Sequence, residues 1–211
     1  MPRELGSTGL QYYCDADKEY WKELKEKFAN KPPSICYKRT TSILGDDMWI
    51  IEGRGTSRNL QQNSLMWYCP VQNRFNISHG KCKGFRALDI CSSYGVSSKA
   101  FLNNHHSVDV IEPEEFMASV VACNSRIWRV SDRMHVQCTD DLHNIVYSGY
   151  DSVRLGTHKL AYILMECPEI YNVKNIVLDF SLNEKFKQSI LERGYEVSSK
   201  YSASFLSFTR A

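Results

Sequence analysis

The chain has 211 residues, of which 43% are hydrophobic and 24% are charged, and its formal net charge is +2. This composition is typical of a globular protein and excludes a collagen-like or highly charged disordered chain. No segment approaches the roughly 20 consecutive apolar residues of a membrane-spanning helix, and no apolar secretion signal opens the sequence. We therefore expect a cytoplasmic protein without a membrane partner.

Charge divides the sequence into two parts. Residues 1–84 contain 13 Lys and Arg against 9 Asp and Glu, whereas residues 85–211 contain 13 against 15. A basic and aromatic-rich segment thus precedes a mildly acidic one. We predict an N-terminal extension over residues 1–84 and one folded domain over residues 85–211.

The extension is expected to contain little regular structure. A helix is predicted over residues 15–28, because aromatic and leucine side chains recur there on one helical face. Short extended segments are expected at residues 48–51 and 65–69. About fifty irregular residues would struggle to bury a core alone, so we expect the extension to help form the acceptor side of a site in the following domain.

The cysteines predict free thiols and no metal centre. Eight cysteines are scattered along the chain, mostly in apolar surroundings, as buried free thiols are. Cys69, His79 and Cys82 lie close in sequence, but their spacing matches no zinc pattern and a fourth ligand is missing.

After Gly84, apolar segments alternate with helical ones. Strands are predicted at residues 87–91, 108–111, 134–138, 152–155, 175–180, 196–199 and 204–209. Helices are predicted at residues 97–103, 113–127, 141–147, 159–170 and 183–193.

This alternation predicts an α/β fold with a Rossmann-like, doubly wound and mostly parallel seven-stranded sheet. Only residues 200–203 separate the last two strands, which leaves no room for a crossover helix. Those two strands must form a C-terminal antiparallel hairpin.

Acidic residues recur where successive predicted strands end. Asp89 lies in the first strand, Glu112 ends the second, and Asp140 and Asp141 follow the third. In a doubly wound sheet, ligands bind beyond the carboxyl ends of the strands. An acid at the second strand tip can accept hydrogen bonds from ribose hydroxyls, so the series predicts a nucleoside site.

Four segments at these strand tips resemble the class I S-adenosylmethionine-dependent methyltransferases. They are LDICSSYG (88–95), VIEPEE (110–115), CTDD (138–141) and YDSVRLGTHK (150–159). The resemblance covers residues 85–211 and implies S-adenosylmethionine as the cofactor.

The family also implies roles for individual residues. The first turn, with Cys91, Ser93 and Gly95, would hold the methionine part of the cofactor, and Asp89 would orient this turn or reach the cofactor amino group through water. Glu112 would hold the ribose, and Asp140 or Asp141 the adenine. Cys91 and Ser93 stand where the family usually has glycines, which favours as one alternative a catalytically inactive RNA-binding or scaffold module with this fold.

The acceptor is predicted from the fourth segment. Cap ribose-2′-O enzymes place an acid at this tip, whereas this chain has Gly156 or Thr157. Chemistry that needs no general base is therefore favoured, such as methylation of guanine N7 in an RNA cap, where alignment suffices. Small viral cap guanine-N7 methyltransferases are similar in size and plan. Expected contacts to capped RNA are Arg54, Arg58, Trp67, Tyr68, Tyr94, Thr157, His158 and Lys159.

A second resemblance is to FkbM-like methyltransferases, through Glu112-Pro113 and the late segment 151–180. It implies O-methylation of a small molecule or sugar, for which His158 is the candidate catalytic base.

Overall fold

The computed structural model describes residues 3–5, 10–12, 35–41, 47–53, 84–92, 94–202 and 205–210. Its strands are β1 (Arg3–Leu5), β2 (Leu10–Tyr12), β3 (Ile35–Thr41), β4 (Asp47–Gly53), β5 (Gly84–Ile90), β6 (His105–Glu112), β7 (Met134–Cys138), β8 (Ser152–Leu155), β9 (Asn175–Leu178), β10 (Tyr195–Ser202) and β11 (Phe205–Arg210). Its helices are α3 (Val96–Phe101), α4 (Glu115–Ile127), α5 (Ile163–Glu166) and α6 (Glu184–Glu192), with the 3-10 helices η2 (His158–Tyr162) and η3 (Pro168–Asn172).

The centre of the molecule is the predicted seven-stranded sheet, with strand order β10-β11-β9-β8-β5-β6-β7. The pairs β5–β6, β6–β7, β5–β8 and β8–β9 are parallel. β11 is antiparallel to both β9 and β10. The predicted C-terminal hairpin is therefore confirmed, and its second strand is inserted between β9 and β10, so that β10 forms the edge.

Helices cover both faces of the sheet, which confirms the doubly wound fold. One face packs Ala87, Val108 and Val110 against α3 and α4. The opposite face packs Leu88 and Ile90 against the segments from η2 to η3. The alternation follows from the strand geometry, because successive side chains point to opposite faces, and it explains why β5 reads as a continuous apolar run.

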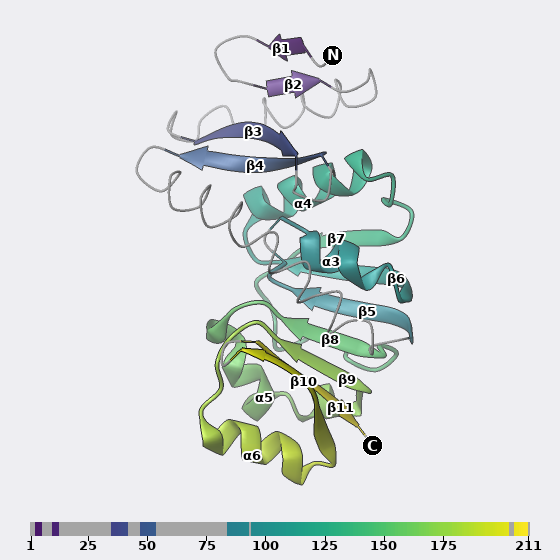
Figure 1. Ribbon diagram of the computed structural model, residues 1–211, viewed down its shortest axis with the longest axis vertical. Coiled ribbons are helices and arrows are strands. Elements are labelled where there is room, and N and C mark those ends of the chain that lie inside the picture. The colour runs from purple at the N-terminus through teal and green to yellow at the C-terminus, as the bar shows by residue number, and fades with distance from the viewer. Residues whose placement is uncertain are drawn as a thin grey trace.

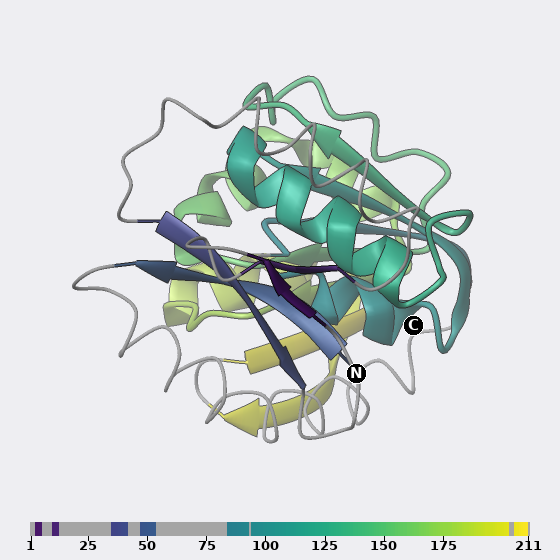
Figure 2. The same ribbon diagram turned by 90° about the horizontal axis from the view of Figure 1, so that it is seen from above.

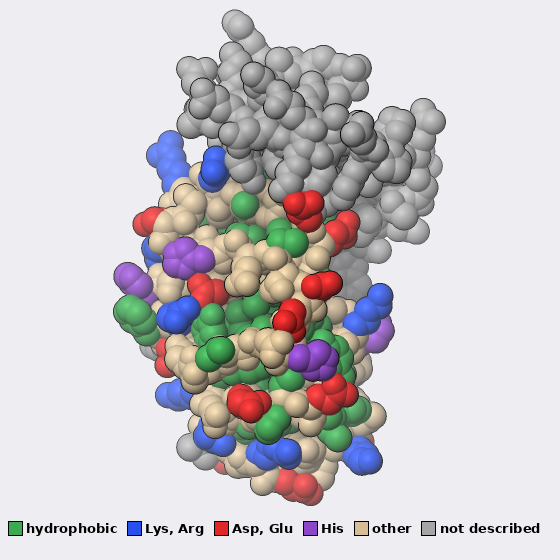
Figure 3. Space-filling model, turned by 180° about the vertical axis from the view of Figure 1, so that it is seen from behind, with side chains coloured by type: hydrophobic (Ala, Val, Ile, Leu, Met, Phe, Trp, Pro, Cys, Tyr) green, Lys and Arg blue, Asp and Glu red, His purple; other side chains and the backbone are tan. Residues whose placement is uncertain are grey.

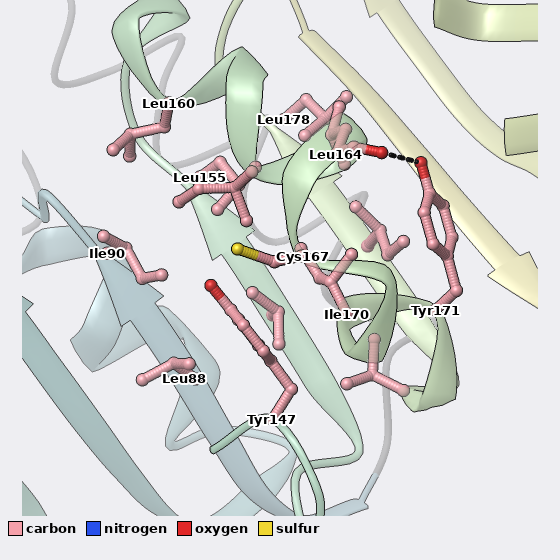
Figure 4. Close-up of a cluster of buried hydrophobic side chains, with 14 of the residues drawn as sticks. Leu88, Ile90, Tyr147, Leu155, Leu160, Leu164, Cys167, Ile170, Tyr171 and Leu178 are labelled. Atoms are coloured by element: carbon pink, nitrogen blue, oxygen red, sulfur yellow. Dashed lines mark hydrogen bonds between the residues drawn. The ribbon is translucent and has the colours of Figure 1, made fainter. Parts of the chain in front are cut away.

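The larger core lies on the second face (Figure 4). Tyr147 is directed into it with its ring beside Ile170 and Cys167, and the Tyr171 hydroxyl donates a hydrogen bond to the carbonyl of Leu164 at 2.7 Å. Burying each leucine or isoleucine side chain of this core contributes roughly 1.5–3 kcal/mol.

Two predicted helices differ from the observed structure. Residues 141–147 form turns and not a helix: Asn144 donates a hydrogen bond to Asp141 at 2.7 Å, and Leu142 and Tyr147 are buried five residues apart, a spacing that no single helical face provides. The helix predicted at 159–170 breaks into η2, α5 and η3, because Pro168 donates no backbone hydrogen bond and disfavours the α conformation before it.

In the N-terminal part, β1 pairs with β2, and β3 with β4, as two antiparallel pairs. The extended segment predicted at 48–51 is confirmed within β4, which lies against α4 (Figures 1 and 2). β3 was not predicted, because Lys38 and Arg39 interrupt its apolar pattern. The helix predicted at 15–28 and the extended segment at 65–69 lie outside the described residues. None of the described helices is long and apolar enough to cross a membrane.

Candidate functional site

The site predicted from the strand-tip acids lies at the topological switch point, where the order of the strands reverses. The chain passes from β5 through α3 to β6 and then to β7 on one side of β5, and it returns from β7 to β8 on the other side. Ligands of doubly wound sheets bind at this switch point, beyond the carboxyl ends of the strands.

The first turn contains a cysteine in a left-handed conformation. Cys91 has φ 59° and Gly95 has φ 83°, which explains why glycines suit these positions. The Cys91 N–H donates to the carbonyl of Ile111 at 2.8 Å and so anchors the turn to β6. Burial, followed by the nearby charges of Glu112 and Asp89, raises the pKa of Cys91 to about 12, so the thiol is neutral near pH 7.

The second strand tip is joined to this turn. Glu112 ends β6, is only 4% exposed, and accepts a hydrogen bond from the Ser92 hydroxyl at 3.1 Å. The carbonyl of Glu112 also accepts from the N–H of Thr139 at 3.3 Å. Three neighbouring strand tips are therefore joined by hydrogen bonds.

At the third tip, Asp140 and Asp141 are exposed just beyond β7. The N–H of Asp141 donates to the Thr139 hydroxyl at 3.2 Å, and its carboxylate accepts from Asn144. These contacts fix the turn and leave both aspartates at the surface beside the Glu112 strand tip.

Asp89 lies beneath the first turn and is fully buried. Its carboxylate accepts from the hydroxyls of Ser97 and Ser98 at 2.5 and 2.7 Å, which hold the start of α3. It also accepts from Arg154 of β8 at 2.7 Å. Asp89 therefore ties the start of α3 to β8.

Arg154 connects Asp89 with a second carboxylate, that of Asp179 just beyond β9, at 2.9 Å. Burial lowers the pKa of Arg154, but the charges and hydrogen bonds of Asp89 and Asp179 outweigh it and keep this pKa above its ordinary value. The guanidinium is thus a permanent buried cation between two aspartates.

Gly156, at the tip of β8, is restricted by close neighbours. A Cβ atom there would lie 2.0 Å from the Cys91 carbonyl oxygen and 2.9 Å from a guanidinium nitrogen of Arg154. Only glycine fits this approach, so the fourth strand has no room for an acid at this position. Thr157 is partly buried beyond it, and His158 and Lys159 are exposed at the start of η2.

The other predicted site residues are placed as follows. Tyr94 is 7% exposed, and its carbonyl accepts from Asn124 at 2.9 Å. Arg54, Arg58, Trp67, Tyr68 and Ser93 lie outside the described residues, as do Cys69, His79 and Cys82. In the described part of the chain, no group of His, Cys, Asp and Glu could hold a metal ion.

Sequence reasoning missed Arg154 and Asp179 as site residues. A signal was present, because an arginine inside the apolar strand Ser152–Leu155 must be paired when buried. Asp179 is likewise an acid at a strand tip, after the apolar run Asn175–Leu178.

Comparison with known proteins establishes the fold. No protein-family model and no curated protein matches the sequence. A candidate tRNA (m1A22) methyltransferase from Streptococcus pneumoniae, in complex with S-adenosyl-L-methionine, is similar in structure with a TM-score of 0.53 and 15% identity, over 66% of this chain and 72% of that one. The B. subtilis m1A22 tRNA methyltransferase TrmK matches with a TM-score of 0.52 and 14% identity, over 65% of each chain.

A candidate O-methyltransferase from Nostoc punctiforme matches with a TM-score of 0.52 and 15% identity, over 69% of this chain and 56% of that one. This chain thus shares its Rossmann-like fold, which the alternation of strands and helices predicted, with structures that are named as methyltransferases.

Proposed function

We propose that this protein transfers a methyl group from S-adenosylmethionine to RNA. The observation that carries the proposal is the hydrogen-bonded series of strand tips at the switch point. Cys91 binds Ile111, Ser92 binds Glu112, and Thr139 binds Glu112. The tips of β5, β6 and β7 thus follow one another in the order in which methionine, ribose and adenine are joined in the cofactor.

The described residues fit such a cofactor. Glu112 is a buried carboxylate at the second tip, where ribose hydroxyls can donate to it. The exposed carboxylates of Asp140 and Asp141 can accept from the adenine amino group, and Asp89 holds the turn for the methionine part. When bound, the cofactor supplies an electrophilic methyl group on a positively charged sulfur.

RNA is the acceptor that we favour. Two of the similar structures are named for tRNA methylation. On the face seen in Figure 3, the described side chains mix basic and acidic groups. The excess of basic residues in residues 1–84, among them Arg54 and Arg58, supports contacts to RNA phosphates.

Within RNA, we propose an unprotonated ring nitrogen as the acceptor atom. N7 of a cap guanine and N1 of an adenine both have a lone pair and no proton to lose, so positioning can carry the reaction. Gly156 excludes an acid from the tip of β8, which supports chemistry without a general base.

Calorimetry with S-adenosylmethionine tests cofactor binding. We expect Glu112→Ala to weaken affinity by about 10- to 100-fold, because it removes a charged hydrogen-bond acceptor. Glu196→Ala, at the exposed edge strand β10, is the matched control and should bind like the wild type. No binding by the wild type at millimolar cofactor would overturn the enzyme and favour the inactive scaffold.

Radiolabelled methyl transfer tests the acceptor. The substrates are RNA capped with guanosine, RNA capped with N7-methylguanosine, and unmodified tRNA transcripts, each digested to nucleosides afterwards. Label on a base nitrogen supports the proposal. Label only on the premethylated cap RNA would indicate ribose-2′-O methylation and contradict a ring-nitrogen acceptor.

The second candidate is O-methylation of a small molecule, which the likeness to a candidate O-methyltransferase favours. A hydroxyl acceptor must lose a proton, and His158 is the candidate base. His158→Ala should then abolish activity, whereas a ring-nitrogen methyltransferase should retain most of it.

A further inference from the structure

A buried ion-pair network crosses three adjacent strands at the candidate site. Arg154 of β8 donates to Asp89 of β5 at 2.7 Å and to Asp179 beyond β9 at 2.9 Å. Its side chain is only 5% exposed. An arginine has a planar fork of donors, so two carboxylates held by one guanidinium are fixed in position.

The two aspartates differ in their access to solvent. The Asp89 side chain is 0% exposed and already accepts three hydrogen bonds, from Ser97, Ser98 and Arg154. The Asp179 side chain is 27% exposed. Asp89 is therefore committed to the cofactor turn, whereas Asp179 can reach a bound molecule.

Asp179 also lies beside the acceptor end of the site. Its N–H donates to the carbonyl of Leu155 at 3.1 Å, which sets it alongside Gly156 at the switch point. Gly156 has no room for a side chain, because Arg154 and the Cys91 carbonyl fill that space. A carboxylate at this position of the sheet therefore comes from β9 and not from β8.

We propose that Asp179 orients the acceptor base by accepting a hydrogen bond from an exocyclic amino group next to the methylated ring nitrogen. Arg154 is a positioning residue that holds this carboxylate and couples it to Asp89 under the cofactor turn. The proposal rests on the proposed function and names its acceptor class.

The charge of Asp179 selects the base. A carboxylate has only acceptor atoms to offer to a bound base. Adenine N1 and cytosine N3 are each flanked by an amino group that can donate, whereas guanine N7 is flanked by the O6 carbonyl, which a carboxylate repels. The acceptor class is therefore an adenine N1 or a cytosine N3 in RNA.

The carboxylate also fits the charge change of the reaction. The ring-nitrogen lone pair forms the new N–C bond, the S–C bond breaks, and its electrons remain on sulfur. The base gains the positive charge that sulfur loses, and no proton moves. The amino group becomes a stronger donor as this charge develops, so its hydrogen bond to Asp179 strengthens in the transition state.

The first measurement is the identity of the methylated nucleoside formed by the wild type on unmodified tRNA transcripts and on guanosine-capped RNA. N1-methyladenosine or N3-methylcytidine is expected. N7-methylguanosine or a 2′-O-methylated nucleoside would overturn the role of Asp179 while leaving RNA methylation intact. Cofactor binding without methylation of either RNA would instead overturn the proposed function and with it this role.

The second measurement pairs Asp179→Asn with removal of the amino group from the RNA. The probe is a synthetic RNA in which hydrogen replaces the amino group of the base at the methylated position. For adenine this base is purine, and for cytosine it is pyrimidin-2-one. On normal RNA, the variant should lose about 10- to 100-fold in kcat/KM, with unchanged cofactor affinity. On the deaminated RNA, variant and wild type should react at equal rates.

A structural role for Asp179 predicts a different result. The variant would then lose the same factor in kcat/KM on both RNAs, which would overturn the proposal. The variant and the wild type are compared on the same RNA each time, so a change in the intrinsic reactivity of the altered base cancels. Asp132→Asn is the matched control. Asp132 is exposed just before the start of β7, at the end of the strand away from the candidate site, so this variant should match the wild type on both RNAs.

Discussion

Two aspartates on neighbouring strands each bind an arginine and two further side chains, but one cluster is buried and the other is partly exposed. Asp89 of β5 binds an arginine and two serine hydroxyls on the face covered by α3, and it is fully buried. Asp109 of β6 binds Arg86, the Tyr150 hydroxyl at 2.6 Å and His135 at 3.0 Å. Asp109 lies on the opposite face of the sheet. It is in register with Leu88, and the side chain of Leu88 points to the face opposite that of its neighbour Asp89.

Exposure separates the two clusters. The side chains of Arg154 and Asp89 are 5% and 0% exposed, whereas those of Arg86 and His135 are 43% and 60% exposed. Removing one partner of a buried pair leaves an uncompensated charge, while water and salt replace a lost partner at the surface. We therefore expect the Asp89 cluster to contribute more to the stability of the fold than the Asp109 cluster, which braces the surface locally.

The largest effect is expected for Asp89→Asn. This change leaves the buried Arg154 guanidinium with one carboxylate in place of two and weakens the anchor of α3. The free energy of unfolding should fall by about 3–5 kcal/mol, measured by urea denaturation.

Salt provides the control for this result. Because the pair is buried, the loss should be the same in 0.1 M and 1 M NaCl. A loss below 1 kcal/mol, or one that salt removes, would show that the guanidinium is solvated in the folded state and would erase the difference between the two clusters.

The sheet itself was predictable from the sequence. Met134–Cys138 and Ser152–Leu155 have the predicted bounds, because short strand segments that alternate with helical segments have few other solutions in a doubly wound sheet. The acids at the strand tips were predictable for the same reason, since parallel strands bring their carboxyl ends to one edge.

Contacts between strands were not predictable. Arg154 was visible as a charge in an apolar strand, but its partners depend on β5 and β9 lying on either side of β8. Gly156 is a glycine because of the Cys91 carbonyl, 65 residues earlier. Residues 141–147 were predicted to be helical, yet Leu142 and Tyr147 are both buried in the core at a spacing that one helical face cannot provide.

An intermediate effect is expected for Asp109→Asn. Hydrogen bonds from Tyr150, His135 and Arg86 outweigh the effect of burial and hold the pKa of Asp109 below its ordinary value. Near pH 7 the variant should lose about 1–2 kcal/mol in its free energy of unfolding, measured by urea denaturation, and part of this loss should disappear in 1 M NaCl.

The pH dependence gives a separate check. A folded-state pKa below the unfolded one stabilises the fold above the unfolded pKa, near 4, and this stabilisation is lost as pH falls through the folded pKa. The difference between wild type and Asp109→Asn should therefore be present at pH 5 and shrink below pH 4. A difference that stays unchanged at pH 2.5 would contradict the ionised brace.

The smallest effect on stability is expected for Cys91→Gly, and Arg129→Gly is its matched control. Both residues adopt left-handed conformations, with φ 59° and 57°. Releasing such a conformation gains roughly 1 kcal/mol, which the greater freedom of glycine in the unfolded chain partly offsets. Each variant should therefore lie within about 1 kcal/mol of the wild type.

The two variants should differ in cofactor binding, measured by calorimetry with S-adenosylmethionine. Cys91 lies in the turn beside Glu112, where loss of its side chain widens the approach to the backbone, so its affinity should rise. Arg129 is exposed in the turn after α4, so its affinity should not change. Equal affinities for both variants would mean that the Cys91 side chain does not face the cofactor, and that the glycine-poor first turn is compatible with full binding.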